Sequence, residues 1–231
     1  MKRSLIIGVG GAHSGAGKTT YASMLFKRLH EWGAIKYTKT SLYSSIVDDL
    51  NILTTEGKDT RRFLDSGAEK VLWVQSPLSG VSETIQIAVE RLSDLKGIVV
   101  EGNSAIEFLK PDIIIFIFGD DPTIIKDSAE KVLNKADIVV CEGKPLMDIP
   151  GYVRLFRKSP EENEKFLDYM AEIVETKEKI REILGSKAID GRLPCAYARR
   201  VAEELGVPYR EVGDVADELD IKITDCELGC F

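Results

Sequence analysis

The fold is decided by a stretch near the amino terminus, Leu5-Ile6-Ile7-Gly8-Val9-Gly10-Gly11-Ala12-His13-Ser14-Gly15-Ala16-Gly17-Lys18-Thr19-Thr20. An apolar run typical of a buried strand leads into a glycine-rich loop, and an amphipathic stretch, 21–32, follows as a predicted helix. In this order the three parts form a phosphate-binding loop, whose backbone N–H groups surround an anion at the positive end of a helix dipole. We therefore predict an α/β P-loop NTPase domain of three layers with a mostly parallel sheet.

The loop residues are expected to hold a nucleoside triphosphate with Mg²⁺. Lys18 would reach the outer phosphates and stabilise the charge that develops on them, and the Thr19 hydroxyl would ligate Mg²⁺. Deviant Walker ATPases carry a lysine where this chain has His13, so membership of that group is disfavoured. The predicted nucleotide contacts in the loop are His13, Ser14, Gly15, Ala16, Gly17, Lys18, Thr19 and Thr20.

Apolar runs alternate with amphipathic segments through the next 120 residues. This alternation predicts right-handed crossovers and a parallel sheet that is covered on both faces. The expected strands are 34–39, 71–75, 97–103, 112–118 and 137–141, and the expected helices are 59–66, 82–93 and 123–136. The polar stretch 40–58 is interpreted as a mobile active-site loop.

Four acidic residues bear on the metal. Glu101 ends an apolar run, and the carboxyl ends of parallel strands face the ligand crevice, so we expect it to hold Mg²⁺ through water or to orient an attacking water. Asp48 and Asp49 could approach Mg²⁺, but a solvated pair is the preferred interpretation. Asp59 would cap the helix that it begins.

A match to the NKxD guanine motif, 134–137, is interpreted as coincidence. It ends a predicted helix and precedes a strand, which places it on the edge of the sheet opposite the phosphate loop. The base is expected near 142–145 instead, with Lys144 as a contact. The sequence leaves GTP and ATP as alternatives.

With these residues in view, 4–143 resembles the molybdopterin-guanine dinucleotide biosynthesis protein B (MobB) family. The resemblance rests on the loop 15–20, the strand 35–38, the segment 57–68 with its Gly-Lys-Asp, and the acidic strand end at 100–102. The family usually has histidine where this chain has Tyr37. The resemblance implies GTP binding, a role in attaching a nucleotide to the molybdenum cofactor, and a homodimer. The implied partner is a molybdopterin nucleotidyltransferase or another cofactor-maturation protein.

Beyond the nucleotide domain, 1–158, we expect a long linking helix, 159–185, stopped by Gly185, and a small helical module, 186–231. Two short helices, 194–205 and 208–219, and a strand, 221–224, would give the module a helix-turn-helix appearance. DNA binding is not expected, because the second helix carries four acids against Arg210.

Cysteines gather in the same module, at Cys195, Cys226 and Cys230. Three thiols are one fewer than a closed structural zinc site uses. Zinc or an iron–sulfur cluster, a disulfide, and packed free thiols all remain open.

The composition limits the setting of the protein. The net charge is −7, and no apolar run approaches the ~20 residues that cross a bilayer. The first residues lead directly into a strand, so we expect a cytoplasmic protein with no membrane or DNA partner.

The expected function is Mg²⁺-dependent binding and slow hydrolysis of a nucleoside triphosphate in molybdenum-cofactor maturation. Lys18, Glu101 and Asp59 would act in hydrolysis, with Asp59 positioning water or metal and with Thr19 and Glu101 serving Mg²⁺. The alternatives are a small-molecule kinase, and a nucleotide-gated metal carrier or redox sensor that uses the cysteines.

Overall fold

The computed structural model describes residues 3–121, 123–143 and 149–226. The chain forms two compact units, Met1–Asp168 and Tyr169–Phe231. The predicted linker boundaries at 158 and 185 differ from this division, which falls inside one helix. Within the described part of the chain, every helix is too short or too polar to cross a lipid bilayer.

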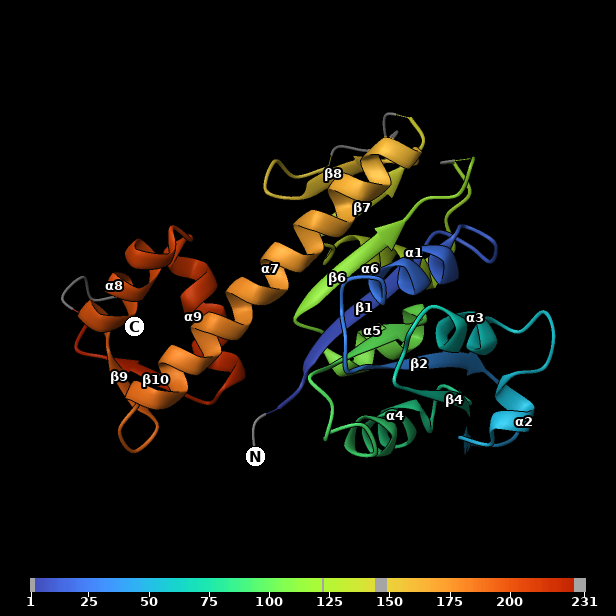
Figure 1. Cartoon of the computed structure of the whole chain (residues 1–231), viewed down its shortest axis with the longest axis horizontal. Helices are drawn as coiled ribbons and strands as arrows, with labels where there is room; N and C mark the ends of the chain where they lie inside the picture. Colours follow the sequence, from blue (N-terminus) through green and yellow to red (C-terminus); the bar gives the residue numbers. More distant parts are fainter. Residues whose placement is uncertain (1–2, 122, 144–148, 227–231) are drawn as a thin grey trace. The chain divides into compact units, whose positions relative to one another are not determined.

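The first unit is built on an eight-stranded sheet with the order β3-β4-β2-β5-β1-β6-β7-β8, and all pairs except β3–β4 are parallel (Figure 1). Every residue of β1 is buried, as expected for a central parallel strand that is covered on both faces. The strands are β1 (Leu5–Gly11), β2 (Trp32–Lys39), β3 (Ser45–Val47), β4 (Lys70–Ser76), β5 (Gly97–Glu101), β6 (Ile113–Ile117), β7 (Ile138–Cys141) and β8 (Arg154–Arg157). The predicted α/β P-loop class is confirmed.

Helices cover both faces of the sheet. One core joins alternate residues of the central strands, such as Ile6 and Val100, to α4 and α5, and α6 packs beside α5. The other face of β1 and β5, which carries Ile7 and Glu101, packs against α1. The helices of this unit are α1 (Lys18–Leu25), α2 (Leu50–Leu53), α3 (Asp59–Asp65), α4 (Val81–Glu90), α5 (Asn103–Leu109), α6 (Asp127–Leu133) and the start of α7 (Pro160–Lys187).

Two predictions about the extent of elements in this unit were wrong. The first helix ends at Leu25, and Trp32 begins β2, where it lies opposite Gly97 and fills the space that the missing side chain leaves. The segment 40–58 is not a structureless loop, because it contains β3 and α2. Asp49 caps α2 by accepting a hydrogen bond from the Asn51 N–H at 2.8 Å.

The second unit contains the last turns of α7, then β9 (Arg192–Pro194), α8 (Cys195–Leu205), α9 (Tyr209–Glu218) and β10 (Lys222–Thr224). Ile180 and Leu184 of α7 enter its core with residues of α8 and α9. Gly185 therefore does not stop α7, because burial of its neighbours outweighs the cost of about 1 kcal/mol for a glycine in a helix. The parallel pair β9–β10 was not predicted.

Candidate nucleotide-binding site

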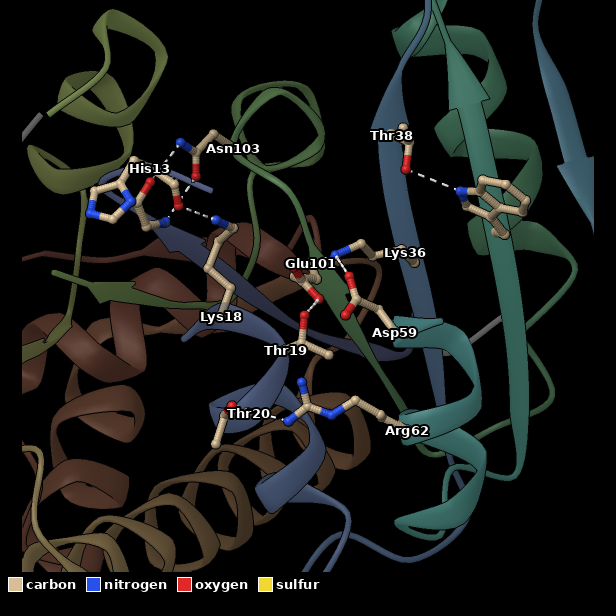
Figure 2. A network of polar contacts seen from close by, with 12 residues as sticks. His13, Lys18, Thr19, Thr20, Lys36, Thr38, Asp59, Arg62, Glu101 and Asn103 are labelled. Carbon is tan, nitrogen blue, oxygen red and sulfur yellow. Dashed lines mark hydrogen bonds and ion pairs between the residues drawn. The ribbon is translucent and has the colours of Figure 1, made fainter. Parts of the chain in front are cut away.

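The glycine-rich loop lies between the end of β1 and the start of α1. Gly15 and Gly17 have φ angles of 83° and 103°, in the left-handed region that favours glycine, and the space where a Gly15 side chain would stand is open. Asn103 fixes the base of the loop (Figure 2). Its side-chain oxygen accepts a hydrogen bond from the Gly11 N–H, and its side-chain nitrogen donates one to the Gly11 carbonyl, both at 2.9 Å. Asn103 thus ties the start of the loop to the first residue of α5.

Lys18 lies folded over this loop. Its ammonium group donates to the His13 carbonyl at 2.7 Å. Burial lowers the pKa of Lys18 below its ordinary value, and the charge of Glu101 partly opposes that effect. A phosphate in the loop would offer this ammonium a charged acceptor in place of a carbonyl.

Two acids and a lysine meet beside the loop, one from each of three elements (Figure 2). Glu101, the last residue of β5, accepts from the Thr19 hydroxyl at 2.8 Å and from Lys36 Nζ at 2.5 Å. Lys36, on β2, also pairs with Asp59 Oδ2 at 2.6 Å. The Glu101 side chain is only 2% exposed, so its charge depends on these two donors.

Asp59 does not cap α3, contrary to expectation. Lys58 holds the N-cap position, and Asp59 in the first turn directs its carboxylate to Lys36. Burial raises the pKa of this carboxyl, but the hydrogen bond and charge of Lys36 outweigh it and leave the pKa below its usual value. Asp59 is therefore ionised at neutral pH.

These residues line a cleft of about 770 Å³. Its walls carry five cationic side chains and two carboxylates, although the whole chain has a net charge of −7. The cations are Lys18, Lys36, Lys39, Arg62 and Lys126. Such an excess of positive charge suits a polyanion.

The structure brings together most of the residues predicted for nucleotide binding. Of the predicted loop contacts, His13, Ser14, Gly15, Gly17, Lys18, Thr19 and Thr20 line the cleft. Ala16 is buried and its N–H bonds to the His13 carbonyl at 3.4 Å, so it lies beneath the lining. Lys144 lies outside the described residues.

The residues of the site that sequence reasoning missed include Lys36, Asn103 and Arg62. Arg62 donates to the Thr20 hydroxyl at 3.0 Å from the exposed side of α3. A lysine inside the otherwise apolar strand 34–37 was the available signal for Lys36, because such a charge needs a buried partner. Nothing local marked Asn103, whose partner is 92 residues away.

Other candidate positions lie elsewhere. Asp48 pairs with Arg91 at 3.8 Å, and Asp49 caps α2. Asp137 of the NKxD match accepts from the Ile114 N–H at 2.7 Å just before β7, at the edge of the sheet opposite Glu101, as expected.

The donor set suits Mg²⁺, a hard cation that prefers oxygen ligands. Thr19, Glu101 and Asp59 supply one hydroxyl and two carboxylates, and the ammonium group of Lys36 already bridges the two acids and offsets one of their two charges. No three Cys, His, Asp or Glu side chains gather into a metal site within the described ranges. The expectation of zinc or an iron–sulfur cluster has no support there: Cys195 begins α8 and Cys226 follows β10, while Cys230 is outside those ranges.

No model of a known protein family matches the chain, and a search of curated proteins finds no match. Among solved structures, HypB from Helicobacter pylori in complex with nickel is 14% identical, with 75% of this chain and 88% of that one covered and a TM-score of 0.50. An LAO/AO transport system kinase is 16% identical, over 94% of this chain and 82% of that one, at a TM-score of 0.40. A nucleotide-binding protein with ADP from Archaeoglobus fulgidus is 11% identical, over 73% and 87%, at 0.38. At these identities the likeness to HypB shows the fold alone, which is that of a P-loop NTPase.

Proposed function

We propose that this protein binds a nucleoside triphosphate with Mg²⁺ and hydrolyses it slowly. The observation that carries the proposal is the Thr19–Glu101 hydrogen bond of 2.8 Å. It lies beside Lys18 and a loop whose glycines have left-handed φ angles. The hydroxyl that would ligate a metal is thereby held against a carboxylate that could hold the same metal through water.

Each residue has a distinct part in this reaction. The loop amides and Lys18 bind the outer phosphates, Lys18 exchanging the His13 carbonyl for a phosphate oxygen. Glu101 orients the Thr19 hydroxyl and accepts a hydrogen bond from a water on the side of the terminal phosphate. Asp59 positions water from the first turn of α3. Bound Mg²⁺ supplies neutralising charge for the transferred phosphoryl group.

The finer assignment is GTP-dependent assistance to molybdenum-cofactor maturation, as a homodimer with a molybdopterin nucleotidyltransferase as partner. It is supported by the resemblance of 4–143 to the MobB family, carried above all by Gly57-Lys58-Asp59. The HypB structure was solved with nickel. Stimulation of hydrolysis by nickel would therefore favour a role with nickel instead of the molybdenum cofactor.

A small-molecule kinase is the second candidate. The cleft of about 770 Å³ carries Lys39 and Lys126 in addition to Lys18, Lys36 and Arg62. These two cations would suit an anionic acceptor beside the triphosphate.

The test uses the purified full-length chain and fluorescent GTP and ATP analogues, with and without Mg²⁺, followed by phosphate release. Lys18→Ala should abolish Mg²⁺-dependent binding. Lys27→Ala removes the same charge from an exposed position outside the cleft, so this variant should bind nucleotide like the wild type. Absence of nucleotide binding by the wild type refutes the proposal, and nucleotide consumption only with an added metabolite favours the kinase.

A further inference from the structure

Lys36 occupies a position between two carboxylates where a metal ion would be expected to bind. Its ammonium group lies 2.6 Å from Asp59 and 2.5 Å from Glu101, the two carboxylates nearest the Thr19 hydroxyl (Figure 2). The contact is built into the sheet, because Lys36 and Glu101 are paired in the register of the parallel strands β2 and β5. The Lys36 side chain is 17% exposed and lines the cleft, so its head has open space to move into.

Resting on the proposed function, we propose that Lys36 is the internal counter-ion of the Mg²⁺ site and that Mg²⁺ binds there only together with nucleotide phosphates. Lys36 holds Asp59 and Glu101 in place while the cleft is free of nucleotide. It releases them when a terminal phosphate offers its ammonium another anion.

The charges of the cleft support this order of binding. Without nucleotide, the ammonium groups of Lys18 and Lys36 stand among five cationic side chains that outnumber the two carboxylates of the cleft. A divalent cation entering alone would face both ammonium groups in a site where Glu101 is almost fully buried, and repulsion there is only weakly screened by water. A triphosphate brings about four negative charges, which can accept both ammonium groups and the metal together.

Lys36 could instead be only a structural ion pair. In that case its removal would leave Glu101 short of a donor and destabilise the fold, with no gain in metal affinity. The two roles therefore predict opposite changes in metal binding, and metal affinity measured without nucleotide separates them.

The experiment titrates Mn²⁺, a paramagnetic substitute for Mg²⁺, into full-length protein without nucleotide and measures free metal by electron paramagnetic resonance. Lys36→Met should bind one Mn²⁺ at least about tenfold more tightly than the wild type, because it removes a repelling charge beside two carboxylates. Lys39→Met removes the same charge from the same strand, where no carboxylate contact is seen in the described structure, and should change metal affinity far less. Adding Glu101→Gln to Lys36→Met should remove the gain.

Three results overturn the inference: wild-type protein that binds Mn²⁺ tightly without nucleotide, Lys36→Met that gains no affinity while circular dichroism shows it folded, or a gain that survives Glu101→Gln. If Lys36→Met does not fold, the wild-type titration and Lys36→Gln still decide. Nucleotide binding by the wild type is measured separately. If the wild type binds no nucleotide, the proposed function is refuted, whereas the effect of Lys36 on metal binding is still tested by the titration without nucleotide.

Discussion

Replacing Glu101 by glutamine changes the charge of the site with almost no change in size. The carboxylate now accepts from Lys36 at 2.5 Å and from Thr19 at 2.8 Å, and an amide has one oxygen for these two donors. One charge-assisted hydrogen bond is lost, which costs about 1.5–3 kcal/mol. Lys36 keeps Asp59 at 2.6 Å, so the ~3–5 kcal/mol cost of an orphaned buried charge does not apply.

Glu101→Gln should therefore lower the free energy of unfolding by about 1.5–3 kcal/mol, as measured by urea denaturation. Glu107→Gln is the matched control: its side chain is 34% exposed and pairs with Lys131 at 2.7 Å, so it should cost under ~1 kcal/mol. A cost for Glu101→Gln no larger than the control would show that the carboxylate is not held as described.

The same variant tests the chemistry. Loss of one preorganised electrostatic contact typically slows a reaction about 10²–10³-fold, and phosphate release should fall by that order at saturating nucleotide. Nucleotide binding measured without Mg²⁺ should change little, because the loop and Lys18 remain. An unchanged rate of phosphate release would refute the role of Glu101 at the metal.

Three further predictions concern packing and protonation. Gly97→Ala would place a methyl group 2.5 Å from the ring of buried Trp32 and should lower the free energy of unfolding by ~1–3 kcal/mol in urea; unchanged stability would contradict that packing. Gly119→Ala would place its Cβ 1.9 Å from His13 Nε2, so the His13 ring must move. Because the same residue supplies the carbonyl that accepts from Lys18, affinity for a fluorescent nucleotide should weaken; wild-type affinity would show that the His13 ring moves independently of the loop. Burial lowers the pKa of Lys18 below the ordinary lysine value of 10.5, and only the charged form binds phosphate well. Nucleotide affinity should therefore be full below the Lys18 pKa and fall as the pH rises through it. Lys18→Arg should flatten this alkaline decline when affinity is measured across the pH range.

Much of the site could be predicted because its signals are local. The loop needs glycines at fixed spacing for its left-handed turns, and Gly15 and Gly17 supply them. Glu101 was predictable because parallel strands end at one edge of a sheet. Lys36 and Asn103 were not, because each has its role through a partner 65 or 92 residues away.

The P-loop α/β class could be predicted from short segments, since continuous apolar strands and a glycine-rich turn are local properties. The ends of the elements and the charge balance of the cleft depend on contacts between segments that are distant in the sequence. Trp32 joined a strand because Gly97 leaves room opposite it, and α7 continued past Gly185 because Leu184 is buried in the second unit. The contact of the Lys36 ammonium group with both Asp59 and Glu101 likewise required two strands and one helix to meet, and burial of Glu101 makes its charge depend on that contact.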